Sequence, residues 1–238
     1  MEINLTFNPA ELRKTQQREW KVVVIDVLRA SSTIVYAFSQ GCKVIYPVAT
    51  IREALKKAEE LGGGGVLGGE RDGVRIKGFH LGNSPQEYSS QVVRNKAVVF
   101  TTTNCTRNLS ALKGPKEVII CAFLNLPAVV DYLLQAGGKI LIALSGTDGE
   151  MSLEDAVCAG MLIERLMKGQ DVSLTDSVRC AHTVYRYYKK DILQALLDSR
   201  HGKRLQEIGF REDIRFCAKV GGYKIIPRFT KGRLICSG

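Results

Sequence analysis

The stretch Val22-Val23-Val24-Ile25-Asp26-Val27-Leu28-Arg29-Ala30-Ser31-Ser32-Thr33 decides the fold class of this chain. Residues 22–25 form an apolar, β-branched run between two polar residues, which predicts a strand buried on both faces. The apolar residues at positions 34–38 then follow helical spacing, so the strand leads into a helix through a short turn. Strands that alternate with helices in this way build parallel sheets covered by helices.

The same alternation continues along the chain. Further buried strands are predicted at residues 44–46, 97–100, 118–120 and 140–142, and an amphipathic helix at residues 51–61. After Leu144 the periodicity is mainly helical, at residues 153–167, 176–188 and 191–197, and two short extended runs, at 223–226 and 233–235, close the chain. We therefore predict an α/β fold with a mostly parallel sheet flanked by helices, a helix-rich C-terminal part and a single domain over residues 1–238.

The composition excludes several classes of protein. The 238 residues are 45% hydrophobic and 24% charged, close to soluble globular averages, which argues against intrinsic disorder, collagen-like repeats and coiled coils. The longest apolar runs, such as residues 139–144, are too short for a membrane span, and the N-terminus does not resemble a secretory signal. The seven cysteines include no C-x-x-C pair, so reduced thiols are expected. A cytoplasmic location with no membrane contact follows as a prediction.

The charge indicates an anionic partner. Lysine and arginine outnumber aspartate and glutamate by 34 to 24, a net charge of +10. Both a small phosphorylated molecule and a nucleic acid fit this excess, but the basic residues are dispersed and no aromatic stacking motif accompanies them. We expect a small anionic substrate and no nucleic acid, with a nucleic-acid-binding α/β module as the alternative.

Residues that can carry chemistry follow directly on predicted strands, at the edge where open α/β sheets bind ligands. Asp26 ends the first strand, where a carboxylate can bind a metal ion. Ser31 or Ser32 is predicted to cap the next helix, leaving backbone N–H groups to meet an anion beside Arg29. The structural alternative is an ordinary helix cap with a surface arginine.

Three further segments offer polar groups near that edge. Thr101-Thr102-Thr103-Asn104-Cys105-Thr106 places hydroxyls and an amide on a second strand-to-helix turn, and Leu67-Gly68-Gly69-Glu70-Arg71 puts an acid and a base in a flexible segment. The loop Gly78-Phe79-His80-Leu81-Gly82-Asn83-Ser84-Pro85 adds donors at Asn83 and Ser84. Each segment also has a structural alternative: a β-branched turn, a solvated ion pair, and a helix that begins at Pro85.

A group of acids is predicted to bind a metal ion. Ser152 and Asp155 fit a capping box at the start of the helix predicted after residue 152, which leaves Glu154 without a structural role. Adjacent helical residues point about 100° apart, so one carboxylate can cap the helix while the other reaches a metal ion. Asp26, Glu70, Glu154 and Asp155 together would form the oxygen-only environment that Mg²⁺ prefers.

Other signatures of phosphate chemistry fit less well. Cys180 and Arg186 have the C-x5-R spacing of cysteine phosphatases, but the segment lacks glycine and is predicted to be helical. Arg200-His201-Gly202 resembles the start of a histidine phosphatase site, yet it follows a predicted helix and is interpreted as a helix terminus. No phosphate-binding G-x-x-x-x-G-K-[ST] loop is present, and Leu28 stands where haloacid dehalogenase phosphatases have a second aspartate.

Taken together, five motifs resemble the 2-phosphosulfolactate phosphatase family, also called the ComB family, in order and spacing. The resemblance runs from about Val22 to Arg233, nearly the whole chain. The motifs are residues 26–33, 67–71, 78–85 and 101–106, and Glu154-Asp155 with Ala159-Gly160.

The resemblance implies a magnesium-dependent phosphatase with an α/β fold particular to the family. Its reaction would convert (2R)-2-phospho-3-sulfolactate to (2R)-3-sulfolactate and phosphate, as in coenzyme M biosynthesis. Asp26, Arg29 and Glu154 are the expected catalytic residues, and Arg29 and Arg71 are expected to bind the oxyanions. The expected neutral donors to the substrate are Ser32, Asn83, Ser84, Thr102, Thr103 and Asn104.

Two departures from the family pattern bear on this site. The family usually has glycine at the position of Cys105, and a turn with positive φ would strain a cysteine there. It tends to have aspartate at the position of His80, for which we favour a neutral hydrogen-bonding role over a catalytic one.

Metal-activated water is preferred as the nucleophile over Asp26 itself, because Asp26 lacks a partner acid two residues later. Another phosphorylated hydroxy acid is the alternative substrate. A homo-oligomer is the default expectation for a soluble enzyme.

Overall fold

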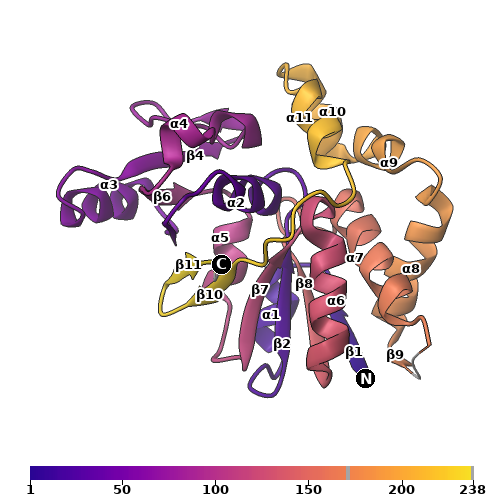
Figure 1. Cartoon of the computed structure of the whole chain (residues 1–238). Coiled ribbons are helices and arrows are strands. Elements are labelled where there is room, and N and C mark those ends of the chain that lie inside the picture. Colours follow the sequence, from indigo (N-terminus) through magenta and orange to yellow (C-terminus); the bar gives the residue numbers. More distant parts are fainter. Residues whose placement is uncertain (170–171, 237–238) are drawn as a thin grey trace.

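The computed structural model of the chain describes residues 1–169 and 172–236 and shows an α/β fold (Figure 1). Its strands form one sheet in the order β5-β4-β6-β3-β11-β10-β7-β2-β8-β1-β9. In chain order these strands are β1 (Glu2–Thr6), β2 (Lys21–Ile25), β3 (Val44–Pro47), β4 (Val66–Arg71), β5 (Val74–Arg75), β6 (Ala97–Thr101), β7 (Glu117–Cys121), β8 (Lys139–Leu144), β9 (Ser173–Leu174), β10 (Arg228–Thr230) and β11 (Arg233–Ile235).

Helices cover both faces of this sheet and form the C-terminal part (Figure 1). The α-helices are α1 (Pro9–Lys14), α2 (Ala30–Ser39), α3 (Ile51–Glu60), α4 (Ser90–Val93), α5 (Cys105–Ser110), α6 (Leu126–Ala136), α7 (Leu153–Leu166), α8 (Asp176–Tyr188), α9 (Ile192–Asp198), α10 (Arg200–Glu207) and α11 (Arg211–Cys217). No helix in the described part of the chain is long and apolar enough to span a bilayer.

The sheet consists of two parallel blocks joined by an antiparallel hairpin. Strands β7, β2, β8, β1 and β9 pair in parallel, and so do β3, β6 and β4. The hairpin β10–β11 lies between the blocks, pairing with β7 at Arg228↔Ile119 and with β3 at Leu234↔Ile45. The prediction of a mostly parallel sheet is confirmed.

Alternation along the central strand explains why helices cover both faces. Every residue of β2 is buried. Val23 and Ile25 belong to a core cluster with residues of α6 and α7, whereas Val22 and Val24 belong to a second cluster with residues of α1 and α2. Because successive side chains of a strand point to opposite faces, a continuous apolar run requires an apolar partner on each face.

The five predicted buried strands and the predicted helices are all present, and three of the differences elsewhere concern strands longer than two residues. Residues 223–226 were expected to be a strand, but the strand there is β10, at Arg228–Thr230. Pro227 precedes β10, and the backbone before it is bonded to a 3-10 helix at Phe123–Asn125: Tyr223 N–H donates to the Leu124 carbonyl, and the Asn125 amide donates to the Ile225 carbonyl.

The other two differences are strands that the sequence pattern concealed. Residues 67–71 were interpreted as a flexible segment, but they belong to β4, where Gly68 and Gly69 pack closely against neighbours. A Cβ added at Gly69 would stand 2.1 Å from the Thr101 carbonyl oxygen of β6, so glycine is required by this close approach. Strand β1 was missed because only continuous apolar runs were interpreted as strands, whereas Glu2-Ile3-Asn4-Leu5 alternates polar and apolar residues.

The helices α9, α10 and α11 form a cap at the end of the sheet where α2 begins (Figure 1). Strand β2 runs into α2 at that end, so the cap stands over the carboxyl ends of the central parallel strands. Because ligands of open α/β sheets bind at these ends, a ligand site is expected in the space under the cap.

Candidate active site

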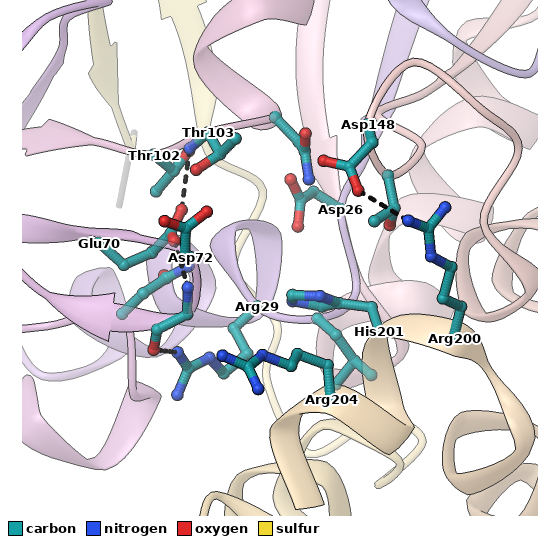
Figure 2. Close-up of a pocket in the computed structure, with 15 residues that line it drawn as sticks. Asp26, Arg29, Glu70, Asp72, Thr102, Thr103, Asp148, Arg200, His201 and Arg204 are labelled. Atoms are coloured by element: carbon teal, nitrogen blue, oxygen red, sulfur yellow. Dashed lines mark hydrogen bonds and ion pairs between the residues drawn. The ribbon is translucent and has the colours of Figure 1, made fainter. Parts of the chain in front are cut away.

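A cavity of about 280 Å³ lies under the cap, between the ends of the strands and α10 (Figure 2). Its volume suits a small metabolite better than a drug-sized molecule. Segments from β2, β4, β6 and β8 and from α10 contribute its walls. The lining residues are Asp26, Leu28, Arg29, Glu70, Asp72, Gly73, Asn83, Thr102, Thr103, Asn104, Thr147, Asp148, Arg200, His201 and Arg204.

Asp26 follows β2 directly and lies at the start of α2. The Ala30 N–H donates to Asp26 Oδ1 at 3.2 Å, which fixes the carboxylate in the turn. Burial, together with the negative charges of Asp155 and Glu70, raises the pKa of Asp26 to about 8, although the N–H of Ala30 stabilises the carboxylate. A buried acid with a raised pKa at the wall of a cavity is a candidate functional group.

The serines beside Asp26 do not cap the helix as predicted. Arg29 occupies the N-cap position of α2 and makes no side-chain cap, while Ser31 and Ser32 lie inside the helix. Ser31 Oγ accepts the Asp26 N–H at 3.0 Å, and Ser32 Oγ donates to the Val27 carbonyl at 2.8 Å. Both hydroxyls therefore hold the turn, and Ser32 does not line the cavity.

Asp155, at the start of α7, holds the same turn from the other side. Its Oδ1 accepts the Val27 N–H at 2.8 Å and its Oδ2 accepts the Gly146 N–H at 3.3 Å. Ser152 is the N-cap of α7 but makes no side-chain cap, so the predicted capping box does not form. Burial, followed by the charge of Glu154, raises the pKa of Asp155 to about 8.

Glu154 faces a smaller neighbouring cavity of about 150 Å³ instead of the main one. Its side chain is buried, and its Oε2 has no hydrogen-bond partner among the described residues. Burial raises the pKa of Glu154 to about 7, and the charge of Asp26 contributes to the shift. The two cavities share Thr147, Arg200 and His201 in their walls.

Glu70 connects two turns at the cavity wall. Its Oε2 accepts the Gly73 N–H and its Oε1 accepts the Thr103 N–H, both at 2.8 Å (Figure 2). The first bond lies in the β4–β5 turn and the second in the turn between β6 and α5. Glu70 thus positions Thr103 and its neighbours, and both of its oxygens are already occupied.

Arg29 lines the cavity with its Nε lacking a hydrogen-bond partner among the described residues, while the rest of its guanidinium is engaged within the protein. Its guanidinium is buried, donates to Asp213 Oδ2 and to the Gly73 carbonyl at 2.6 Å each, and stacks on the Phe210 ring at 4.2 Å. Ser84 donates to the other oxygen of Asp213 at 2.7 Å, so this predicted donor is occupied as well. Arg29 therefore joins the start of α2, the β4–β5 turn and α11.

The remaining predicted substrate-binding residues divide into two groups. Asn83, Thr102, Thr103 and Asn104 line the cavity. The side-chain oxygens of Asn83, Thr102 and Thr103 are buried without a hydrogen-bond partner among the described residues. Arg71 lies outside the cavity, because its guanidinium donates to the Glu70 carbonyl and to Thr101 Oγ1.

The two departures from the expected motifs have simple structural explanations. Cys105 is the first residue of α5 and is not among the residues with positive φ, so the suspected strain does not arise. His80 lies outside the cavity and its Nδ1 accepts the Leu67 N–H at 3.0 Å. This contact agrees with the neutral hydrogen-bonding role that the sequence favoured.

Sequence reasoning missed the basic side of the cavity. Arg200, His201 and Arg204 come from α10, and Asp148 comes from the loop after β8. The interpretation of residues 200–202 as a helix terminus is correct, since α10 begins at Arg200, but their side chains also line the cavity. The available signal for this basic side was the spacing of Arg204, four positions after Arg200 and three after His201 on one helix.

The predicted metal ligands are only partly brought together. Asp26 and Glu70 line the main cavity, Glu154 faces the neighbouring one, and Asp155 is bonded to backbone N–H groups behind Asp26. Among the described residues, no three or more histidine, cysteine, aspartate or glutamate side chains are grouped as metal ligands. All four predicted groups nevertheless offer oxygen, the ligand type that Mg²⁺ prefers.

Comparisons with known proteins identify relatives over nearly the whole chain. Residues 6–232 match the family model described as 2-phosphosulpholactate phosphatase. The chain is 36% identical to a probable 2-phosphosulfolactate phosphatase of Clostridium acetobutylicum, covering 99% of this chain and 100% of the relative. It is 41% identical to a protein of the same description from Thermotoga petrophila, covering 90% of each chain, and 35% identical to one from Clostridium novyi, covering 96% and 97%.

Proposed function

The chain belongs to the 2-phosphosulfolactate phosphatase family of phosphoric monoester hydrolases, and from this membership we propose that it hydrolyses (2R)-2-phospho-3-sulfolactate to (2R)-3-sulfolactate and phosphate. The observation that carries the proposal is Asp26: a buried acid at a strand end, in the wall of a small cavity that also presents unpartnered oxygens. The reaction is that of coenzyme M biosynthesis, and a cytoplasmic location and a homo-oligomeric state are part of the same proposal.

The cavity has two chemically different sides, which suits an ester with several charged groups. Thr102, Thr103 and Asp26 lie on one side, and His201 and Arg204 of α10 lie on the other (Figure 2). Hydroxyl and amide groups such as those of residues 102–104 can donate to phosphoryl oxygens without adding charge. We place the phosphoryl group on this side, next to Asp26.

Mg²⁺ is the proposed cofactor, and the donor chemistry of the wall fits it. Mg²⁺ commonly uses only one or two carboxylates, with waters and substrate phosphate completing its shell, so a grouping of three acids is not required. Asp26 is the acid best suited to hold it, because both oxygens of Glu70 accept backbone N–H groups and Glu154 faces the neighbouring cavity. When bound, Mg²⁺ would neutralise phosphoryl charge and make a coordinated water more acidic.

The protein's own contribution to the reaction is positioning and charge. A phosphomonoester dianion repels nucleophiles, so binding its oxygens in a fixed geometry is the main task of the site. Thr102, Thr103 and Asn104 hold the phosphoryl group, while Glu70 fixes the turn that carries them. Leu28, which lines the cavity two residues after Asp26, provides no acid for a phosphoaspartate pathway, so we propose attack by water.

Arg29 takes a different part from the one that the sequence suggested. With its charge directed at Asp213 and the Gly73 carbonyl, it fixes the turn after Asp26 and the β4–β5 turn relative to each other. Arg29 is therefore proposed to position the cavity walls.

Phosphate release from a panel of esters tests the proposal. We expect the highest kcat/KM for (2R)-2-phospho-3-sulfolactate, with loss of activity in a chelator and recovery when Mg²⁺ is added. A higher value for another phosphorylated hydroxy acid would change the substrate and leave the reaction in place. The absence of phosphate release from every ester, with and without Mg²⁺, would contradict the proposal.

The nucleic-acid-binding alternative has a separate test. No observation on the described part of the chain favours it. A gel shift with duplex DNA and RNA across salt concentrations should show no complex at physiological salt, because dispersed surface charges give weak, salt-sensitive binding.

A further inference from the structure

The helix α10 is held firmly over the cavity. The Ser199 hydroxyl accepts the Gly202 N–H at 2.9 Å and so caps the helix. Gly202 then approaches α9 so closely that an added Cβ would stand 1.7 Å from the Leu196 carbonyl oxygen. Leu205 is fully buried on the side away from solvent. These contacts fix which face of α10 meets the cavity.

That face presents Arg200, His201 and Arg204; Arg204 is four positions after Arg200 and three after His201, so the three side chains lie within an arc of about 100° around the helix. Arg200 is already paired with acids of the loop after β8, at 3.2 Å from Asp148 and 3.1 Å from Glu150. Burial and the nearby charge of Arg29 lower the pKa of His201, which disfavours its charged form. Arg200 therefore faces two carboxylates at once, and burial disfavours a positive charge on His201.

Arg204 differs from the other cations of the cavity wall. Its ion pair is with Glu207, one turn further along α10, at 3.5 Å between two exposed side chains. Exposed pairs of this kind contribute little and exchange easily with other partners. Arg29 is buried and paired with Asp213, and Arg200 faces two carboxylates, so Arg204, with one partner at 3.5 Å, is the most weakly paired lining arginine among the described residues.

The position of Arg204 also separates it from the proposed phosphoryl group. It lies across the cavity from Thr102, Thr103 and Asp26 (Figure 2). A substrate that fills the cavity with its phosphate beside Asp26 would extend its non-reacting end toward α10. In the proposed substrate this end carries a carboxylate and a sulfonate, which are anions and need a cationic partner.

We propose that Arg204 binds the non-reacting anionic group of the substrate and thereby sets the preference for esters that carry a second acid group. The inference rests on the proposed function. Since the contact lies away from the reacting atoms, its loss should raise KM more than it lowers kcat.

Four esters and three variants test this role. The esters are (2R)-2-phospho-3-sulfolactate with both acid groups, 2-phospholactate with the carboxylate alone, 2-phosphooxyethanesulfonate with the sulfonate alone, and isopropyl phosphate with neither. The variants are Arg204→Met, Arg204→Lys and the matched control Lys203→Met. Lys203 is the exposed neighbour on the same helix and does not line the cavity.

The measured quantity is kcat/KM for each ester divided by kcat/KM for isopropyl phosphate. In Arg204→Met we expect this ratio, the preference for 2-phospho-3-sulfolactate over isopropyl phosphate, to fall by about 10- to 100-fold, the usual range for a charged hydrogen bond. Arg204→Lys should retain part of the preference and Lys203→Met all of it. If Arg204→Met lowers this ratio for one of the two single-acid esters, the acid group of that ester is the one that Arg204 binds.

Failure of the inference and failure of the proposed function look different. If the wild-type enzyme prefers the two-acid ester, and Arg204→Met keeps that preference or Lys203→Met loses it equally, the role of Arg204 is wrong and the phosphatase proposal stands. If the wild-type enzyme releases phosphate from none of the four esters, the phosphatase proposal is wrong and the role of Arg204 falls with it.

Discussion

At the scale of single residues, the buried pair Arg29–Asp213 shows how charge holds the cavity together. The pair joins α2 to α11 at 2.6 Å, and Arg29 and Asp213 are only 1% and 5% exposed. Breaking a buried pair leaves one charge without compensation in a medium of low polarity, which costs far more than breaking a pair in water.

Replacement of Asp213 tests this reasoning. Asp213→Asn should lower the free energy of unfolding by about 3–5 kcal/mol, measured by urea denaturation, because Arg29 would remain buried without a counterion. Glu212→Gln on the same helix is the control: its pair with Arg215 is exposed, and the change should be below about 1 kcal/mol. Equal effects of the two substitutions would refute the role given to Asp213.

Sequence motifs located the site better than they assigned its contacts. Asp26, Asn83 and Thr102 were expected at the cavity and line it, because their places after strands follow from the α/β pattern. Arg29 and Arg71 were expected to bind substrate but are engaged within the protein, since their partners come from distant segments that no local pattern announces.

At the scale of elements, the β10–β11 hairpin joins the two parallel blocks of the sheet. It contributes one pairing to each block and buries Leu234 between helix-covered faces. The hairpin is short, and Leu234 is its fully buried side chain, with Phe229 partly buried against the same core cluster.

A matched pair of leucine truncations measures that contribution. Leu234→Ala should cost about 2–5 kcal/mol of unfolding free energy, because Leu234 is 0% exposed and its loss leaves a cavity. Leu134→Ala on α6 removes the same atoms from a side chain that is 36% exposed, and it should cost less than about 1.5 kcal/mol. A small loss of unfolding free energy in Leu234→Ala would mean that the hairpin does not hold the two parallel blocks together.

Elements were predictable where apolar periodicity was strong and hidden where it was not. The continuous apolar runs of β2, β6, β7 and β8 predicted buried strands correctly. Strand β4 was concealed by glycines, because its pairing depends on close backbone approach and not on side-chain pattern. The cap over the site could not be predicted in the same way, because its position depends on tertiary packing and no local pattern says which strand ends α10 will cover.

At the scale of the whole molecule, the buried acids make stability depend on pH. Burial raises the pKa of Asp26 and Asp155 from 3.8 to about 8, and that of Glu154 from 4.5 to about 7. Between about pH 4 and pH 8 the folded state thus binds protons that the unfolded state has lost, so stability from these groups is complete below about pH 4 and decreases as pH rises. The pKa of His201 is lowered, so this one group makes stability increase as pH rises.

The thermal midpoint of the metal-free protein tests this dependence. It should fall between pH 5 and pH 8, and the decrease should be smaller in Asp26→Asn, which removes one of the titrating acids. A divalent cation at the acids would offset the effect, so Mg²⁺ should raise the midpoint more at pH 8 than at pH 5. A midpoint that rises with pH in the absence of metal would show that the acids are not buried as a group.

Asp26, at the end of β2, is proposed to carry hydrolysis of the phosphate ester in the cavity under the cap. The most direct measurement compares phosphate release by wild type, Asp26→Asn and the control Asp131→Asn, an exposed aspartate on α6. We predict a loss of kcat/KM of at least about 100-fold for Asp26→Asn alone, with unchanged circular dichroism. Wild-type rates of phosphate release from folded Asp26→Asn would contradict the account.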